Sequence, residues 1–275
     1  MTKEIADKYE KLKSILSAYG SLAVAFSGGV DSTFLLVTAK EVLGENLIAV
    51  TARIQSMPEA ERDAAASFCE KESIRLLTVD FDELSIPGFA ENPPNRCYIC
   101  KRAIFTILRE CAGKEGFRIV AEGSNADDTS DYRPGMQALS ELGIKSPLLE
   151  AGLTKGEIRL LSKEMNLPTW NQPSKACLSS RFAYGETITK EKLRMVDEAE
   201  SCLSEFGIAQ LRVRMHANDL ARIEVLPEDF ETVTYHRSEI DRKFRELGFR
   251  YVSLDLKGFR SGSMNEALGD SSQRK

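Results

Sequence analysis

The chain has 275 residues, 42% of them hydrophobic and 29% charged, a composition that suits a globular protein with one large and one small domain. Lysine and arginine number 37 against 42 aspartates and glutamates, which argues against a polyanion such as RNA as the main partner. No apolar run approaches the ~20 residues of a membrane span, and residues 1–20 predict an amphipathic helix rather than a signal peptide, so we expect a cytoplasmic protein without a nucleic-acid or membrane partner.

The first predicted strand and helix surround a glycine turn. Leu22 to Phe26 is an unbroken apolar run, typical of a strand buried on both faces. Ser27, Gly28 and Gly29 interrupt the run, and helical spacing follows through residues 30–41. Such a turn presents unpaired backbone N–H groups to an anion, and its glycines let a phosphate approach closely. We therefore predict a phosphate site here, to which the serines add hydroxyl donors.

The turn contains no lysine, so it is not a Walker A loop. The string SGGVDS, from Ser27 to Ser32, instead resembles the pyrophosphate loop of the N-type ATP pyrophosphatases, the PP-loop superfamily. The resemblance implies ATP cleavage between the α and β phosphates and adenylation of a carbonyl or carboxyl oxygen. That reaction needs Mg²⁺, and Asp31 is the candidate ligand by its position in the loop. The plainer alternative is a glycine-serine turn that carries an unrelated aspartate.

Predicted strands and helices alternate through residue 165. Further strands are predicted at 47–52, 74–79, 118–122 and 145–149. Helices are predicted at 58–73, 97–111, from 134, and at 154–165, the last with a capping-box pattern. The alternation predicts an α/β fold with a doubly wound parallel sheet. Ligands bind beyond the carboxyl ends of such strands, where the candidate nucleotide-binding residues are Ala52, Gly123 and Asp127.

The pattern changes near residue 189. A helix at 190–206, an antiparallel strand pair at 211–215 and 221–225, a helix at 227–247 and a strand at 251–256 are predicted. We expect a PP-loop domain over 1–186, a small C-terminal α+β domain over 187–260 for substrate binding or oligomerisation, and a polar tail over 261–275.

The six cysteines do not predict a disulfide framework. Three lie among apolar residues in helical patterns and are expected in the core: Cys69, Cys111 and Cys202. Cys97 and Cys100 form a CxxC motif, which suits a redox pair, half a zinc site or two ligands of an iron–sulfur cluster. Cys177 lies in another irregular cationic segment. Three such cysteines favour a 4Fe-4S cluster with one open iron, whereas a zinc site would need His216 or His236 as the fourth ligand.

Several motifs together carry a more specific resemblance. They are SGGVDS, RCYICK, EGSNADD with DYRPG, ACLSSRF, LRVRMH and GFRSGSMNE. The combination, spread from Ser27 to Glu266, resembles the LarE family, the ATP-dependent sulfur transferases that make the thiocarboxylates of the nickel-pincer nucleotide cofactor. The resemblance implies that a carboxylate of pyridinium-3,5-biscarboxylic acid mononucleotide is adenylated and then attacked by sulfur. It also implies an adenine nucleotide alpha hydrolase-like fold and a homo-oligomer, often a hexamer.

The family comes in two forms. In one, a single cysteine at the position of Cys177 gives up its own sulfur. In the other, three cysteines hold a 4Fe-4S cluster whose open iron carries a sulfide for transfer. Because Cys97 and Cys100 accompany Cys177, the chain resembles the second form. The resemblance implies that Cys177 and Asp31 are catalytic.

Two arginines are candidate ligands of the substrate phosphate. Arg212 and Arg214 are two apart on a predicted strand and so share a side, from which both can grip a phosphate bidentately. The family resemblance points to them for this role. Arg181, beside Cys177, and Glu200 are candidate substrate contacts. The alternative for Arg212 and Arg214 is a solvent-exposed pair on an edge strand without a ligand. The alternative for Glu200 is an ordinary glutamate on a helix surface.

Three other functions compete with sulfur transfer to a nucleotide. A tRNA thiolation enzyme also pairs a PP-loop with three cysteines, but the acidic balance argues against it. An amide-forming enzyme of the GMP-synthetase kind leaves the three cysteines unexplained. A regulator that binds ATP without consuming it is the third alternative.

Overall fold

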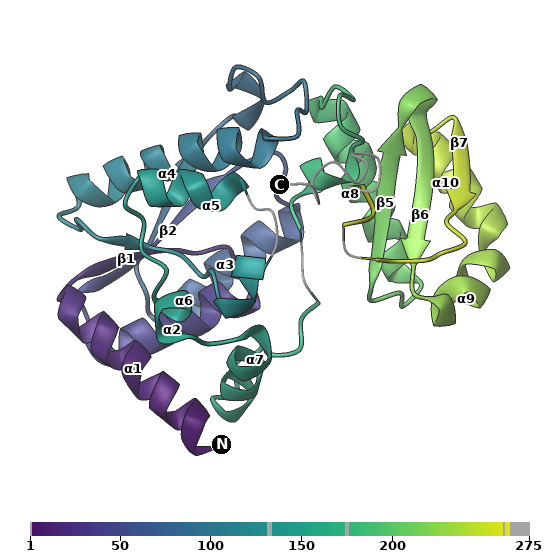
Figure 1. Ribbon diagram of the computed structural model, residues 1–275. Helices are drawn as coiled ribbons and strands as arrows, with labels where there is room; N and C mark the ends of the chain where they lie inside the picture. The colour runs from purple at the N-terminus through teal and green to yellow at the C-terminus, as the bar shows by residue number, and fades with distance from the viewer. Residues whose placement is uncertain (1, 131–133, 174–175, 261, 265–275) are drawn as a thin grey trace. The chain divides into compact units, whose positions relative to one another are not determined.

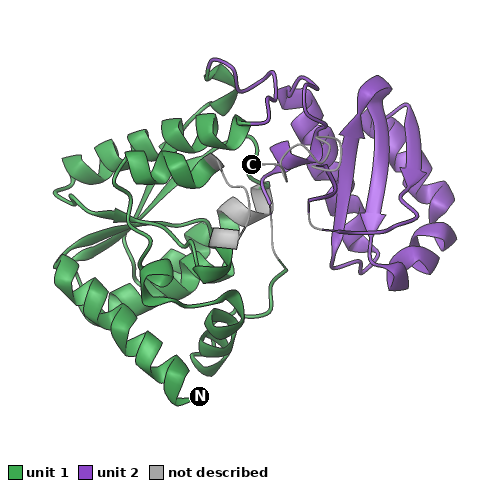
Figure 2. Ribbon diagram, in the orientation of Figure 1, with its two compact units in different colours: residues 1–86, 95–175 green, residues 87–94, 176–275 purple. Residues whose placement is uncertain are grey.

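The computed structural model describes residues 2–130, 134–173, 176–260 and 262–264. Its contacts divide the chain into two compact units, unit 1 with residues 1–86 and 95–175 and unit 2 with residues 87–94 and 176–275 (Figure 2). We expected the division after residue 186. Residues 176–186 belong to unit 2, in which Phe182 forms a parallel bridge with Met215 and Ala183 donates its N–H to the Met215 carbonyl at 3.4 Å. Of the expected tail 261–275, residues 262–264 are described.

Unit 1 is a parallel sheet with helices on both faces (Figure 1). Its strands, in the spatial order β3-β2-β1-β4, are β1 (Leu22–Ala25), β2 (Leu47–Arg53), β3 (Leu76–Asp80) and β4 (Val120–Ala121). Its helices are α1 (Lys3–Tyr19), α2 (Val30–Leu43), α3 (Glu59–Lys71), α4 (Arg96–Lys114), α5 (Pro134–Glu141), α6 (Pro147–Ala151) and α7 (Lys155–Glu164). Two 3₁₀ turns, η1 (Glu83–Ser85) and η2 (Ala126–Ser130), complete it. The predicted α/β, doubly wound parallel sheet is confirmed.

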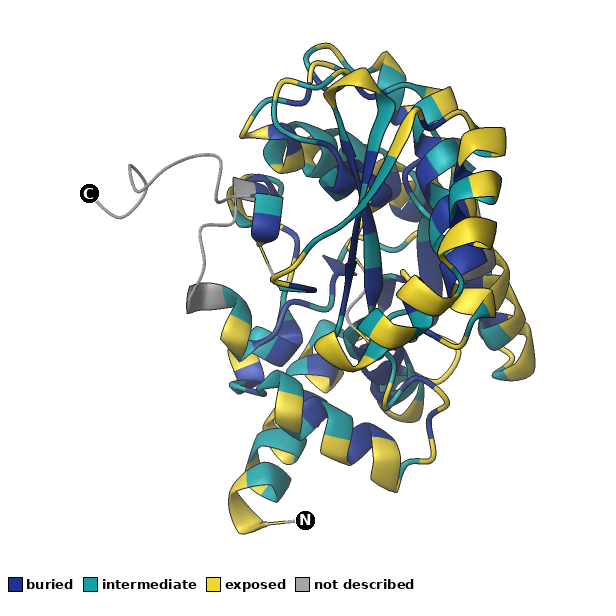
Figure 3. Cartoon of the chain, turned by 90° about the vertical axis from the view of Figure 1, so that its right-hand side faces the viewer, coloured by how far each residue is buried: buried dark blue, intermediate teal, exposed yellow. Residues whose placement is uncertain are grey.

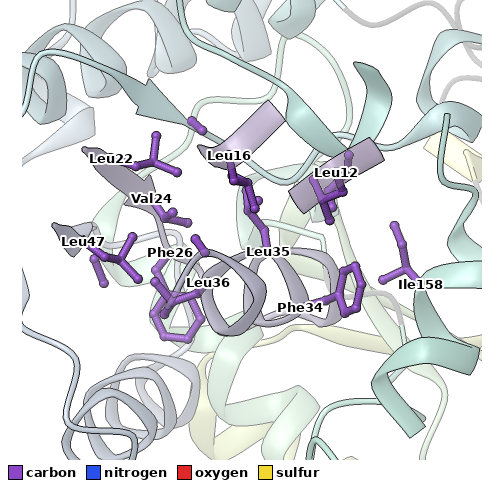
Figure 4. Close-up of a cluster of buried hydrophobic side chains, with 14 of the residues drawn as sticks. Leu12, Leu16, Leu22, Val24, Phe26, Phe34, Leu35, Leu36, Leu47 and Ile158 are labelled. Carbon is purple, nitrogen blue, oxygen red and sulfur yellow. The ribbon is translucent and has the colours of Figure 1, made fainter. Parts of the chain in front are cut away.

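Successive side chains of β1 point to opposite faces of the sheet and show which helices cover each face. Leu22 and Val24 pack with residues of α1, α2, α3, α6 and α7, and Figure 4 shows part of this cluster around Phe34 and Leu36. Ala23, which points to the opposite face, packs with residues of α4 and α5. Buried residues occur along the strands and in the helices, alongside exposed ones on the same helices (Figure 3). The first strand is therefore central, and the turn that follows it lies at the middle of the sheet edge.

The predicted strand at 145–149 is wrong. Lys145 makes only an isolated parallel bridge with Ala121, and the chain then enters α6. Pro147 is the first residue of this helix, a position where its fixed φ favours a helix and its missing N–H costs nothing. The apolar run that suggested a strand is buried in a helix instead. The predicted capping box of α7 is confirmed, with Thr154 and Glu157 each accepting a backbone N–H of the other.

Unit 2 is a small α+β unit. Its sheet has the order β5-β6-β7, with β5 (Leu211–His216) antiparallel to β6 (Leu220–Val225) and β7 (Tyr251–Leu254) parallel to β6. Its helices are α8 (Lys190–Glu205), α9 (Phe230–Tyr235) and α10 (Arg237–Leu247), and its 3₁₀ turns are η3 (Leu178–Arg181), η4 (Ala217–Asp219) and η5 (Pro227–Asp229). No helix in the described ranges has the length and apolar character needed to cross a membrane.

The single helix predicted at 227–247 is wrong, because this segment is broken into shorter helices. The chain forms η5 and α9, and then α10 begins after His236. The His236 ring stacks on Phe206 at 4.4 Å between centroids, and its backbone lies at φ −89° and ψ 9°. The Thr234 hydroxyl also donates to the carbonyls of Phe230 and Glu231, a bond that bends helices. These contacts explain the break at His236.

Candidate functional site

The turn after β1 forms an open cradle at the start of α2. Gly28 has φ 74°, in the left-handed region that favours glycine. Gly29 is the N-cap of α2 and supplies no side chain to cap the first-turn N–H groups. These donors and the positive end of the helix dipole therefore face the turn, as a phosphate site requires.

Two serine hydroxyls support this turn. Ser32 is buried, and its hydroxyl donates to the Gly29 carbonyl at 3.2 Å and lies 3.1 Å from the hydroxyl of Ser27. Ser27 is exposed. The buried serine thus holds the loop in shape, while the exposed one can donate to a ligand.

Gly123 brings the segment after β4 against the start of α2. A Cβ atom at Gly123 would lie 3.0 Å from the backbone nitrogen of Ser32 and 3.2 Å from the Cβ of Asp31. Only glycine allows this approach without a shift of the backbone. The structure therefore brings together Gly123, Asp31 and Ser32, three residues that we assigned to one site from their positions in the sequence.

Asp31 has one paired and one unpaired carboxylate oxygen. Its Oδ2 accepts a hydrogen bond from Lys155 Nζ at 2.5 Å. Its Oδ1 is buried and has no hydrogen-bond partner among the described residues. Burial raises the pKa of Asp31 above its usual value, and the charge of Lys155 opposes this shift. A half-buried carboxylate with one unpaired oxygen fits a hard cation such as Mg²⁺.

Asp127 lies in η2 and fixes the start of α7. Its Oδ2 accepts the backbone N–H of Lys155 at 2.9 Å, and its own N–H donates to Asn125 Oδ1 at 3.0 Å. Lys155 therefore contacts both candidate carboxylates, Asp127 through its backbone and Asp31 through its side chain. Lys155 was not identified from the sequence. Its place at the first position of the capped helix α7 carries no local signal of these contacts.

The end of β2 carries the candidate residue Ala52, whose side chain has no polar group. Ala52 is buried and pairs with Val79 of β3. The loop beyond β2 is held by Glu83, which is buried and accepts the N–H groups of Gln55 at 3.0 Å and Ser56 at 2.5 Å. Glu83 was not found from the sequence because its partners lie in a distant loop.

The CxxC cysteines lie at the start of α4, in unit 1. Cys97 is exposed in the first turn and Cys100 is half-buried one turn later, so the two share a helix face. Asn95 is the N-cap and makes no side-chain capping bond. Both cysteines are outside disulfides.

Three of the remaining cysteines were expected in the core, and two of them are buried there. Cys69 and Cys202 are buried, whereas Cys111 is half-buried. Burial raises the pKa of Cys69 to about 11, which makes its thiol inert. Cys177 is exposed and precedes η3 in unit 2. No three histidine, cysteine, aspartate or glutamate side chains within the described ranges are grouped as metal ligands.

Arg181 is tied to the backbone around Cys177. Its Nη1 donates to the carbonyls of Ala176 at 2.5 Å and Cys177 at 3.2 Å, and to the Ser180 hydroxyl at 3.0 Å. Its Nε and Nη2 each donate to one carboxylate oxygen of Glu200 at 2.8 Å. The side chain is 3% exposed. The arginine and the glutamate therefore brace the Cys177 turn.

Arg212 and Arg214 lie on β5 of the same unit. Arg214 is buried, pairs with Glu224 at 2.9 Å and donates to the Ser180 carbonyl at 3.1 Å. Arg212 lies over the Phe259 ring at 5.3 Å. Burial lowers the pKa of Arg212 to about 10, and the charges of Arg181 and Arg214 add to this effect.

The burial of Arg214 contradicts the alternative that Arg212 and Arg214 form a solvent-exposed pair. Arg214 is 5% exposed. Glu200 is likewise not on a helix surface, since its Oε1 also accepts the N–H of Val213 at 2.9 Å. Guanidinium groups near one another disfavour each other's charge. Glu200 and Glu224 offset part of this cost, and an anion such as a phosphate would offset more of it.

Two motifs lie partly outside the described residues. They are residues 131–133 of DYRPG and residues 261, 265 and 266 of GFRSGSMNE.

Comparison with known proteins gives relatives along nearly the whole chain. No protein-family profile matches. An uncharacterized protein of Synechocystis is 41% identical over 266 residues, which cover 96% of this chain and 99% of that protein. The pyridinium-3,5-bisthiocarboxylic acid mononucleotide synthase of Lactiplantibacillus plantarum is 38% identical over 265 residues, 96% of each chain. One of the subunits of the glutamine-hydrolysing GMP synthase of Thermoplasma volcanium is 30% identical over 193 residues, 66% of this chain and 62% of that protein.

Proposed function

Because this chain belongs to the LarE family of PP-loop enzymes, we propose that it is an ATP-dependent sulfur transferase that turns a carboxylate of pyridinium-3,5-biscarboxylic acid mononucleotide into a thiocarboxylate. The similarity over 96% of both chains to a synthase whose name states this bisthiocarboxylic product supports the substrate class. The structural observation that carries the proposal is the glycine cradle at α2, with the open carboxylate oxygen of Asp31 beside it.

The first step of the proposed reaction is adenylation. A carboxylate oxygen of the substrate attacks the α-phosphorus of ATP, the bond to the bridging oxygen of the β-phosphate breaks, and pyrophosphate leaves. The N–H groups at the start of α2 and the Ser27 hydroxyl would donate to the departing pyrophosphate. Asp31 would hold Mg²⁺, which neutralises phosphate charge when it is bound.

The second step replaces oxygen by sulfur. A sulfur nucleophile attacks the carbonyl carbon of the acyl adenylate, a C–S bond forms, and AMP leaves with the former carboxylate oxygen. The chemistry of Cys97, Cys100 and Cys177 fits a 4Fe-4S cluster, because all three thiols are outside disulfides and Cys97 and Cys177 are exposed. Such a cluster, with one iron left open by three thiolates, would supply a renewable site for the transferred sulfur.

Unit 2 is the proposed binding region for the substrate nucleotide. Arg212 and Arg214 are the proposed ligands of its phosphate, since partial burial lowers the pKa of both guanidinium groups and an anion would stabilise their charges. Arg181 and Glu200 hold the Cys177 turn close to these arginines within the same unit. The family resemblance also leads us to propose a homo-oligomer, a hexamer in particular, which light scattering would measure.

Anaerobic purification with iron and sulfide analysis and an ultraviolet–visible spectrum tests the cluster. We expect four irons per chain in the loaded protein. The Cys97→Ala variant is expected to lose the cluster and multiple turnover, whereas Cys111→Ala, on the same helix, keeps both. Iron-free protein that transfers a single sulfur per chain would contradict the cluster and favour a sacrificial Cys177. Full multiple turnover in Cys97→Ala would also contradict the cluster, but it would not favour the sacrificial form, which acts once per chain.

Pyrophosphate release separates the proposal from its rivals. Release that depends on the pyridinium nucleotide excludes a regulator that only binds ATP. Release that depends on tRNA, together with a gel shift of bulk tRNA at moderate salt, would indicate a tRNA thiolation enzyme. The partial similarity to the GMP synthase of Thermoplasma volcanium makes ammonia the competing nucleophile to test, because an amide-forming enzyme would use it in place of sulfur to displace AMP.

A further inference from the structure

The carboxylate of Asp31 already has a cation beside it. Lys155 Nζ lies 2.5 Å from its Oδ2, while its Oδ1 is buried without a partner in the described part of the chain. The side chains are only 27% and 22% exposed. The electrostatic interaction in this ion pair is therefore screened less by water than it would be on an open surface.

The backbone of Lys155 is fixed although its side chain is long. Its N–H donates to Asp127, and the Thr154–Glu157 capping box spans it. The preceding loop residue Leu153 accepts the N–H of Ala126 at 2.8 Å. Four methylene groups separate this fixed backbone from the ammonium group, so the charge can move by several ångströms at no cost to the fold.

A divalent ion and the ammonium group compete for the same carboxylate. Mg²⁺ binds carboxylate oxygens at about 2.1 Å and requires a nearly octahedral shell. An ammonium group hydrogen-bonded to Oδ2 occupies part of that shell and adds a like charge. The glycine turn at 27–32 contains no lysine of its own, whereas ATP phosphates bound there would attract one.

We infer that Lys155 is an exchangeable cation of the nucleotide site. It neutralises Asp31 in the nucleotide-free enzyme, gives up the carboxylate to the divalent ion that arrives with ATP, and then donates to the phosphates. The inference deepens the proposed function and rests on its ATP site. The consequence is that free metal binds weakly and metal–nucleotide binds well, because only the nucleotide offers the ammonium group a new partner.

Metal and nucleotide binding test the exchange separately. Mn²⁺ replaces Mg²⁺ as the probe, and its free concentration is followed by electron paramagnetic resonance with full-length protein at pH 8. The affinity for Mn²⁺ with ATP is measured by calorimetry. We compare Lys155→Met and Lys155→Arg with Lys192→Met, a control in which a lysine 24% exposed and paired with Glu186 at 2.8 Å is removed from unit 2.

The two affinities are expected to change in opposite directions. Lys155→Met should bind Mn²⁺ alone about tenfold more tightly and Mn²⁺-ATP about tenfold more weakly. Lys155→Arg keeps a cation beside Asp31 and should bind Mn²⁺ alone as the wild type does, and so should Lys192→Met.

Either missing effect overturns the exchange. If Lys155→Met binds free Mn²⁺ no more tightly than wild type, Lys155 does not guard the carboxylate. If it binds Mn²⁺-ATP with full affinity, Lys155 does not serve the phosphates. Should Lys155→Met unfold, Lys155→Gln gives the same comparison with an uncharged polar group. Failure of sulfur transfer would not alter these binding results, so the inference and the proposed function fail separately.

Discussion

The contact between Gly123 and α2 makes a sharp prediction for Gly123→Ala. The new Cβ would lie 3.0 Å from the Ser32 nitrogen and 3.2 Å from both the carbonyl carbon and the Cβ of Asp31. All three atoms belong to the backbone or lie next to it, so the helix start must move by a few tenths of an ångström. Overpacking of this kind costs about 1–3 kcal/mol. The reduced freedom of the unfolded chain offsets about 0.4–1 kcal/mol.

The expected net effect is a loss of about 1–2 kcal/mol in the free energy of unfolding, measured by urea denaturation. The same shift moves the N–H groups and Asp31, so the affinity for ATP should fall about tenfold. Gly113→Ala is the matched control, because a Cβ at Gly113, within α4, meets nothing within 4 Å. Alanine there should stabilise the protein by up to about 1 kcal/mol. If Gly123→Ala is as stable as wild type and binds ATP equally well, the close approach is not what shapes the site.

Three further variants test other parts of the structure. Arg181→Lys keeps a charge but loses the paired bonds to Glu200 and the carbonyl contacts around Cys177. We expect the free energy of unfolding, measured in urea, to fall by about 2–3 kcal/mol, and the turnover to fall with an unchanged KM for ATP. A fully active Arg181→Lys enzyme would contradict the bracing role. Leu35→Ala empties a fully buried position and should cost about 3–4 kcal/mol, whereas the exposed Leu256→Ala should cost almost nothing. Burial raises the pKa of Asp255, but bonds from Lys257, Arg260 and Arg222 outweigh it and hold that pKa below 3.8. The stabilisation by Asp255 is therefore complete above pH 3.8 and is lost as the pH falls through the lower folded value. Asp255→Asn should cost about 2 kcal/mol at pH 7 and progressively less in acid, and a pH-independent difference would refute this.

Local chemistry explains what could be predicted from the sequence. The turn at 27–32 and the capping box at Thr154 depend on residues close in the chain, and both are found in the structure. The strand at 145–149 was wrong because an apolar run of that length suits a buried strand or a buried helix, and Pro147 decides in favour of the helix. The break at His236 depends on stacking against Phe206, a contact with no local signal.

The site residues that were missed depend on distant partners. Lys155 meets Asp31 across 124 positions of sequence, and Glu83 binds the N–H groups of a loop 27 and 28 positions away. Nothing in the residues around Lys155 shows that its ammonium group will reach a carboxylate on α2. Arg181 and Glu200 were candidates from the sequence, but the bonds between them depend on how α8 packs, which no local pattern shows.

Product analysis tests the central claim most directly. Anaerobically purified protein is mixed with ATP, Mg²⁺, sulfide and pyridinium-3,5-biscarboxylic acid mononucleotide, and pyrophosphate and the nucleotide product are quantified, the latter by mass spectrometry. We expect one pyrophosphate for each oxygen replaced by sulfur. Pyrophosphate release without any thiocarboxylate, or no release at all, would contradict sulfur transfer to this substrate.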